Sequence, residues 1–310
     1  MRALVVSNML PDRGHPERGR FVRDQVDALR RLAGIDVELH EFAPGKRALA
    51  RAAWDLRRRY GRERLDVVHA HFGLSAWPAL AVRAKVRALT VHGTDLSHPR
   101  TRGLTRRVIP HMDILAAASA PLAQRLPAES ERAQVLPCGV DLVRFHPIPR
   151  ARARGELELD SDEPFVLFLA SPSRPEKRYD HALMLARDAN VEVRALGTVA
   201  PERVALWINA SNAVIVPSAR EGFGLAVLEA LACDVPVLAT PVGVHSEALR
   251  GVAGTLCAPF ELDAWRRALA PHLRAPDPRV EGRRHAEPFS AERMAERVTA
   301  AWRAALDGAG

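Results

Sequence analysis

Short apolar runs alternate with longer amphipathic segments along nearly the whole chain. A short apolar run that ends at Gly or Pro is typical of a buried strand, and apolar residues that recur every three or four positions are typical of a helix. The first half is therefore predicted to hold strands at residues 3–8, 35–42, 65–71, 86–93, 113–119 and 133–139, and helices at 20–32 and 48–60. This alternation predicts a mostly parallel sheet with helices on both faces.

The alternation stops between residues 141 and 162, where two prolines, a basic cluster and an acidic cluster follow one another. A domain boundary near residue 148 is predicted in this segment. The pattern then resumes, with strands expected at 164–171, 191–197, 212–218 and 235–241, and helices at 179–187, at 202–209, before Cys233 and at 289–306. We expect two doubly wound α/β domains, 1–148 and 149–288, which face a central cleft, and a C-terminal helix, 289–310, which packs back toward the first domain.

Composition places the chain among ordinary globular proteins. Of its 310 residues, 47% are hydrophobic and 26% are charged, which excludes a disordered or collagen-like chain. No apolar run approaches the ~18 residues that a membrane span requires, and the apolar stretch at the N-terminus is too short for a signal peptide. Cys138, Cys233 and Cys257 lie far apart without C-x-x-C spacing, so we expect neither disulfides nor zinc, and a cytoplasmic location.

The charge is unevenly distributed. Residues 1–150 hold 26 Lys and Arg against 15 Asp and Glu, whereas residues 151–310 hold 19 against 22. The segment 46–64 combines many arginines with Trp54 and Tyr60. Such a helix either lies peripherally on an anionic membrane or forms a plain solvated surface. Nucleic acid is not an expected partner, because aromatic residues make up only 5% of the chain and no nucleic-acid-binding motif is present.

The most informative stretch begins where the strand expected at 212–218 ends. Glu221 is followed by Gly222, Phe223, Gly224 and Leu225, which open a helix. A helix start of this kind leaves several N–H groups free and favours an anion. Glu229 lies eight residues beyond Glu221, about 12 Å along a helix, so the two carboxylates could flank a diphosphate and accept hydrogen bonds from sugar hydroxyls. The alternative is that Glu221 caps the helix and Glu229 is solvated.

Two further groups of candidate residues follow predicted strands. Arg174 and Lys177 lie in the loop after 164–171, where they could neutralise a diphosphate; the alternative is a solvated basic turn. His92 ends the strand 86–93 and precedes Gly93, which permits close backbone approach; the alternative is a core histidine.

Several other chemistries lack their motifs. The loop after the first strand has no G-x-G-x-x-G, and no P-loop occurs, so neither a nicotinamide dehydrogenase nor a P-loop ATPase is expected. Gly19 in that loop is a candidate for contact with an acceptor or a phosphate. Asp160-Ser161-Asp162 is a D-x-D in the linker, interpreted as solvated, and no metal or other cofactor is expected.

The segment from Glu221 to Glu229 resembles the E-x7-E motif of retaining glycosyltransferases of family 4, which have the GT-B fold and use nucleotide-diphosphate sugars. Residues 135–147 are similar to the end of that family's N-terminal domain, 217–249 to its donor site and 289–302 to its closing helix. The first half resembles the family only at 66–71 and 91–96, so the acceptor is not readable.

The resemblance implies roles for the candidate residues. Glu221 would contact the donor sugar, the amides of 222–225 would approach sugar and phosphate, and Glu229 would hold the ribose. Lys177 would bind the diphosphate, and His92 would lie near the anomeric centre, where its ring could donate to a sugar hydroxyl or its carbonyl could stabilise positive charge. The family's arginine five residues before the lysine is replaced here by Pro172, and Arg174 is the candidate substitute.

The expected function is transfer of a sugar from a nucleotide-diphosphate sugar to an acceptor with retention of configuration and without a metal. Two alternatives stay open. One is a non-catalytic subunit that binds a nucleotide sugar, and the other is a nucleotide-sugar epimerase, for which no acid–base carboxylates were located.

Overall fold

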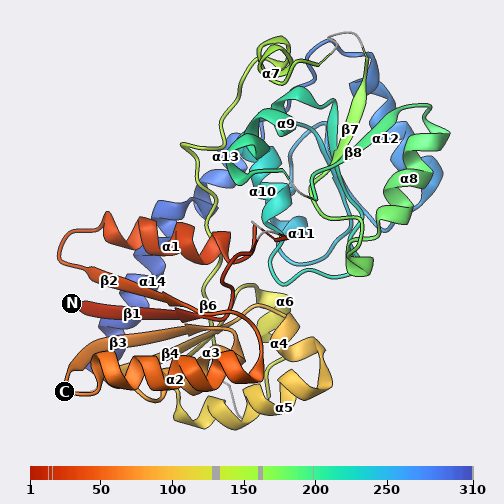
Figure 1. The fold of residues 1–310 in the computed structure, drawn as a ribbon. Coiled ribbons are helices and arrows are strands. Elements are labelled where there is room, and N and C mark those ends of the chain that lie inside the picture. Colours follow the sequence, from red (N-terminus) through yellow and green to blue (C-terminus); the bar gives the residue numbers. More distant parts are fainter. Residues whose placement is uncertain (13, 16, 128–132, 160–162, 198, 309–310) are drawn as a thin grey trace. The chain divides into compact units, whose positions relative to one another are not determined.

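The computed structural model describes residues 1–12, 14–15, 17–127, 133–159, 163–197 and 199–308 (Figure 1). It divides into two compact units. Unit 1 comprises Met1–Gly139 and Ala291–Gly310, and unit 2 comprises Val140–Ser290. The predicted boundary near residue 148 lies within unit 2, because the chain joins that unit at Val140, whose N–H donates to the carbonyl of Phe289 at 2.8 Å.

Unit 1 contains a six-stranded parallel sheet in the order β2-β1-β3-β4-β5-β6. The strands are β1 (Arg2–Ser7), β2 (Asp36–Glu41), β3 (Arg64–His71), β4 (Arg83–Val91), β5 (Ile114–Ala117) and β6 (Gln134–Val135). They coincide with the six predicted apolar runs, and the prediction of a parallel α/β sheet is confirmed.

Helices cover both faces of this sheet (Figure 1). They are α1 (Arg20–Arg30), α2 (Lys46–Tyr60), α3 (Gly73–Ala79), α4 (Thr94–Ser97), α5 (Pro99–Val108), α6 (Ala120–Ala123) and α14 (Ala291–Asp307). On one face α1 packs against α14, whose apolar residues Met294, Val298 and Trp302 recur at four-residue spacing and are buried with Val26 and Leu29 of α1. On the other face α3 lies on the sheet between α2 and α5.

Unit 2 has a five-stranded parallel sheet in the order β11-β10-β9-β7-β8. Its strands are β7 (Phe165–Phe168), β8 (Glu192–Ala195), β9 (Ala213–Val216), β10 (Val237–Ala239) and β11 (Leu256–Cys257). Its helices are α7 (Arg150–Glu156), α8 (Tyr179–Asp188), α9 (Val204–Ala210), α10 (Leu225–Ala232), α11 (His245–Ala248), α12 (Leu262–Arg274) and α13 (Arg283–Ala286). The sequence predicted four of these strands but neither β11 nor α12.

The parallel sheets place the candidate residues in loops at the carboxyl ends of strands. His92 follows β4 in unit 1, residues 171–178 follow β7 in unit 2, and residues 217–224 follow β9, which is paired with β7. Ligands of α/β proteins bind beyond this end of the sheet. The fold therefore carries Lys177 and Glu221 to adjacent positions although 44 residues separate them in the sequence.

Candidate active site

A buried ion pair joins the two loops of unit 2. Lys177 is the last residue of a 3-10 turn (Pro175–Lys177), and its Nζ donates to Oε1 of Glu221 at 2.6 Å. Their side chains are only 14% and 9% exposed. Ser218 Oγ donates to the same carboxylate oxygen at 2.7 Å, and the N–H of Ala219 donates to the carbonyl of Glu176 at 2.9 Å. The pair and the backbone bond together hold the β7 and β9 loops against each other.

The ion pair keeps Glu221 charged. Burial raises the pKa of this carboxyl, but the charge and hydrogen bond of Lys177, with smaller contributions from His245 and Ser218, together lower it by more, so the pKa lies below its ordinary value. The bonds from Lys177 and Ser218 both go to Oε1. Within the described part of the chain, Oε2 accepts no hydrogen bond and can serve a ligand hydroxyl.

The start of α10 is held in a conformation that only glycine adopts easily. Gly224 precedes the helix with φ 111°, and a Cβ there would lie 2.4 Å from Nε2 of His245. Gly243 has φ 60°, and a Cβ there would lie 2.1 Å from the carbonyl oxygen of Phe223. That carbonyl also accepts the N–H of Val244 at 2.7 Å. The segment 221–224 is therefore fixed against 240–245, and the first N–H groups of α10 follow directly after it.

His245 was not singled out by sequence reasoning, and it packs directly on this segment. Its side chain is fully buried, and its Nδ1 lies 2.8 Å from the carbonyl oxygen of Thr240. Because a carbonyl can only accept, Nδ1 carries the proton and Nε2 presents a lone pair. Nε2 has no hydrogen-bond partner among the described residues. The sequence gives no signal for this histidine, because its partner is the backbone carbonyl of Thr240, a group that every residue type possesses.

The other two candidate side chains of unit 2 are Arg174 and Glu229. Arg174 pairs with Glu176 on its own loop at 2.8 Å, and its side chain is half exposed. Glu229 is half-buried on α10. Burial raises the pKa of Cys233 to about 12, and the charge of Glu229 contributes to the rise. The guanidinium of Arg174 thus pairs with Glu176, although its carbonyl accepts the N–H of Lys177 at 3.0 Å.

In unit 1, the ring of His92, which is half-buried, contacts a chain of buried polar side chains. Gln25 Nε2 lies 3.1 Å from Nε2 of His71, and Nδ1 of His71 lies 2.9 Å from Nε2 of His92. Nδ1 of His92 faces Sγ of Cys138 at 4.0 Å. Both ring nitrogens of His92 therefore face other groups of unit 1. The carbonyl oxygen of His92 accepts no hydrogen bond from the described residues.

Histidines at the ends of β3 and β4 form one neutral cluster. The rings of His69 and His71 stack at 4.8 Å, and those of His71 and His92 at 5.1 Å. Burial lowers the pKa of His69 and of His92 to about 3, and lowers that of His71 well below its ordinary value. His69 and His71 are both buried in the core of unit 1. The sequence feature that could have indicated the contact of His71 with His92 is the pair His69 and His71 at the end of β3, which lies beside β4, the strand before His92.

The last two expectations concern Gly19 and a metal. Gly19 has φ 69° at the start of α1, and a Cβ there would lie 2.4 Å from the carbonyl oxygen of Met9, so local structure alone requires glycine. The D-x-D at 160–162 lies outside the described residues. Among those described, no cluster of His, Cys, Asp and Glu is arranged to hold a metal ion. Nor is any described helix both long and apolar enough to cross a bilayer.

The chain thus consists of two parallel-sheet α/β units, one of which carries a buried Lys–Glu pair beside a glycine-initiated helix. Residues 5–144 match the model of glycosyltransferase family 4, and residues 150–287 match that of glycosyl transferases group 1. The chain belongs to glycosyltransferase family 4. It is 30% identical to the D-inositol 3-phosphate glycosyltransferase of Mycobacterium avium (strain 104), over 78% of this chain and 70% of that protein. It is 33% identical to the enzyme of that name from Actinosynnema mirum, over 78% and 73%.

Solved structures share the fold at lower identity. Sucrose-phosphate synthase from Thermosynechococcus elongatus superposes with a TM-score of 0.74 at 20% identity and 99% coverage of both chains. Anabaena HepE in complex with UDP-glucose superposes with a TM-score of 0.69 at 16% identity, over 98% of this chain and 100% of that one.

Proposed function

We propose that this glycosyltransferase transfers a sugar from a nucleotide-diphosphate sugar, bound by unit 2, to a hydroxyl acceptor with retention of anomeric configuration. The observation that carries the proposal is the buried Lys177–Glu221 pair at the carboxyl ends of β7 and β9, beside the start of α10. A buried pair is a weak stabiliser, because the desolvation of both charges offsets their attraction. Its placement at this end of the sheet is better explained by a ligand that carries both a negative charge and hydroxyl groups.

The donor's two chemical parts match the two members of the pair. One N–H of Lys177 is used by Glu221, and the ammonium has two more for a diphosphate oxygen. The N–H groups at the start of α10 add further donors for the same anion. Oε2 of Glu221 accepts from a sugar hydroxyl, and Glu229 accepts from the ribose. The binding of UDP-glucose by HepE, which has the same fold, supports a donor of this class.

The transfer step needs no protein base. The acceptor oxygen attacks the anomeric carbon from the side on which the diphosphate leaves, so the bond from that carbon to the diphosphate oxygen breaks as the new glycosidic bond forms. The acceptor's proton passes to the departing diphosphate oxygen. Lys177 and the α10 N–H groups stabilise the charge that develops on the leaving group. His92, whose ring nitrogens face His71 and Cys138, contributes its carbonyl oxygen rather than its ring.

The experiment measures the release of nucleoside diphosphate from UDP-, GDP- and ADP-sugars with a panel of acceptors. The panel includes inositol phosphates, because the relatives are named D-inositol 3-phosphate glycosyltransferases. We expect acceptor-dependent release, and an unchanged anomeric coupling constant in the product by NMR. Lys177→Met should abolish release, whereas Lys85→Met, which removes an ammonium from β4, should not.

The alternatives give different results in the same assay. A non-catalytic binding subunit would show thermal stabilisation by a nucleotide sugar without release from any donor–acceptor pair. An epimerase would convert the donor into another sugar that contains the same nucleotide. A product of inverted configuration would contradict the retaining mechanism alone.

A further inference from the structure

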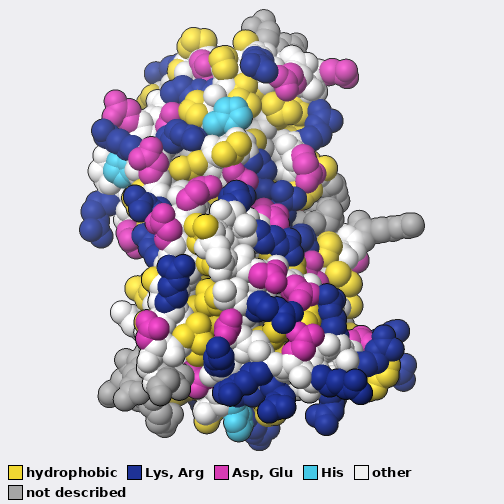
Figure 2. Space-filling view, turned by 90° about the vertical axis from the view of Figure 1, so that its left-hand side faces the viewer, with side chains coloured by type: hydrophobic (Ala, Val, Ile, Leu, Met, Phe, Trp, Pro, Cys, Tyr) yellow, Lys and Arg dark blue, Asp and Glu magenta, His cyan; other side chains and the backbone are white. Residues whose placement is uncertain are grey.

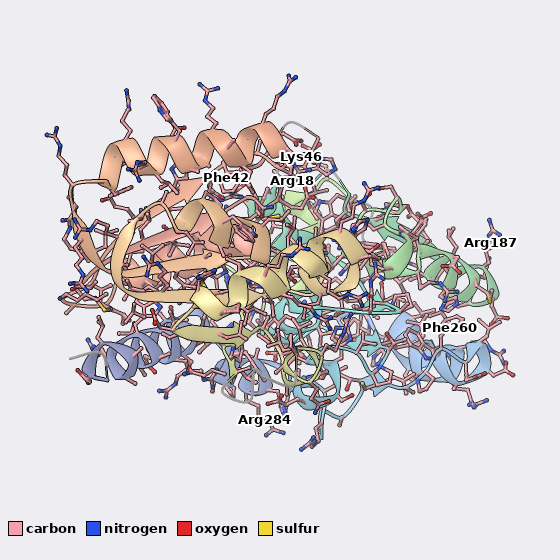
Figure 3. All side chains as sticks on the ribbon, turned by 90° about the horizontal axis from the view of Figure 1, so that it is seen from below. Arg18, Phe42, Lys46, Arg187, Phe260 and Arg284 are labelled. Atoms are coloured by element: carbon pink, nitrogen blue, oxygen red, sulfur yellow. The ribbon has the colours of Figure 1, made fainter. Side chains whose placement is uncertain are left out.

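The outward face of α2 carries a continuous stripe of basic side chains around an exposed tryptophan. Arg47, Arg51, Trp54 and Arg58 follow at spacings of four, three and four residues, which places them on one side of a helix. Trp54 is 60% exposed, and the guanidinium of Arg58 lies 5.2 Å from the centre of its ring. Figure 3, with Lys46 labelled near the start of α2, shows long nitrogen-tipped side chains that stand out from this helix.

Among the residues that the structure describes, the arginines of this stripe form no ion pair, unlike many others on the molecule. Arg59, on the flank of α2, pairs with Glu38, and Arg2 pairs with Glu63. Within the described part of the chain, no ion pair involves the arginines of the outward side of α2 and the turn after it, which are Arg47, Arg51, Arg57, Arg58 and Arg62. Their charges are therefore available to an external anion.

The helix α5 extends the same chemistry. Arg100, Leu104 and Arg107 follow at helical spacing, and Leu104 is exposed. No ion pair among the described residues involves Arg100, Arg102, Arg106 or Arg107. Because α2 and α5 both pack on α3, they belong to one face of unit 1. Figure 2 shows Lys and Arg side chains gathered along the lower edge of unit 1, where these helices lie in Figure 1.

We propose that this face, defined by the outward side chains of α2 and α5, docks on an anionic lipid bilayer. The unpaired arginines supply attraction to lipid phosphates over an extended surface. Trp54 and Leu104 each have arginines at neighbouring positions of their own helix. An apolar side chain in such a setting can enter the boundary between headgroups and acyl chains while the guanidiniums bind the headgroups. A nucleic acid fits this face less well, because single-strand binding uses a row of aromatic side chains and only Trp54 is present here.

The test measures co-sedimentation of the full chain with vesicles of phosphatidylcholine alone and with 30% phosphatidylglycerol. We expect binding only to the anionic vesicles, and loss of binding in 0.5 M NaCl. The double variant R51E/R58E should bind at least about tenfold more weakly. The matched control is R267E/R274E on α12, which reverses two exposed arginines of unit 2 and should bind as the wild type does.

A second readout addresses Trp54. Vesicles with brominated acyl chains should quench part of the wild-type tryptophan fluorescence, and Trp54→Ala should remove that part because the ring no longer reaches the acyl chains. Equal vesicle binding by R51E/R58E and R267E/R274E would overturn the proposal. Binding to a duplex DNA fragment without binding to anionic vesicles would also overturn it.

Discussion

The Lys177–Glu221 pair can be tested by removal of one charge and then of both. Lys177→Met keeps a side chain of similar length but leaves the Glu221 carboxylate buried, with only Ser218 as hydrogen-bond donor. Breaking a buried pair on one side costs about 3–5 kcal/mol. The two side chains retain 14% and 9% exposure, so we expect the lower end of that range, about 3 kcal/mol of unfolding free energy.

The double variant separates stability from activity. In K177M/E221Q neither charge remains, so part of the lost stability should return, with a coupling energy of about 1–3 kcal/mol relative to the two single variants. Turnover should not return, because both groups that bind the donor are altered. Hydrogen exchange of the amides in β9 and α10 reports the opening free energy of unit 2 separately from unit 1. Nucleoside diphosphate release reports activity.

The effect of pH gives an independent check on the same variants. The pKa of Glu221 is lowered in the folded chain, so the pair's contribution to stability is fully present above the ordinary pKa and is lost as the pH falls through the folded pKa. Without Lys177, burial raises that pKa instead. The difference in stability between wild type and Lys177→Met should therefore shrink as the pH falls from the raised pKa of the variant to the lowered pKa of the wild type, two values that lie on either side of the ordinary pKa. If the unfolding free energy lost in K177M/E221Q equals the sum of the losses in the two single variants to within about 0.5 kcal/mol, the coupling between Lys177 and Glu221 is refuted.

Four further predictions follow from the geometry. Glu221→Ala should reduce turnover far more than Glu229→Ala, because only the former contacts the reacting sugar; equal losses in kcat would reverse these roles. Gly224→Ala should lower the unfolding free energy by about 1–3 kcal/mol, because it combines a positive φ with a clash against the buried ring of His245. In the control Gly155→Ala, the added Cβ meets no atom within 4 Å, so this variant should be as stable as the wild type or more stable in urea unfolding. Acidification from pH 7 to 4.5 should lower the unfolding free energy of unit 1, because the unfolded chain protonates its histidines at a higher pH than the folded chain does. In His71→Gln, the fall of unfolding free energy with pH should be smaller by about 1.4 kcal/mol per pH unit, measured by hydrogen exchange in β3 and β4. An unchanged pH dependence would contradict a neutral buried His71. Transfer should persist in EDTA, and a strict requirement for added Mg²⁺ or Mn²⁺ would contradict the metal-free step.

The strands were readable from the sequence because each one in the centre of a parallel sheet is buried on both faces. Such strands appear as uninterrupted apolar runs, as at 3–8 and 164–171. The two-residue edge strand β11 is too short to produce such a run. The helix α12 was missed because Pro271 lies within it, although Trp265 and Leu269 are buried at helical spacing.

The segment between the predicted domains was misleading in composition. Its basic residues suggest a solvated linker, but Arg150 and Arg154 lie on α7 and are buried. Arg150 donates to the carbonyl of Pro276 at 2.8 Å, and Arg154 to that of Ala210 at 3.0 Å. Because the acceptors are backbone carbonyls far away in the sequence, the residues near these arginines do not indicate that the arginines are buried.

Several residues of the candidate site were predictable from the sequence, but His245 and the contacts between these residues were not. Lys177 and Glu221 were singled out separately, and only the pairing of β7 with β9 shows that they touch. The proximity of Arg174 to Lys177 in sequence suggested a shared role, yet the nearer Glu176 captures its guanidinium. His92 was expected to act through its ring or through its carbonyl, and the neighbouring strand supplies His71, whose Nδ1 lies 2.9 Å from one nitrogen of that ring.

A crystal structure with a bound nucleoside diphosphate tests the account most directly. The account predicts that the diphosphate lies within hydrogen-bond distance of Lys177 Nζ and of N–H groups at the start of α10, with Glu229 at the ribose. A nucleotide bound elsewhere, with the Lys177–Glu221 pair untouched, would contradict it.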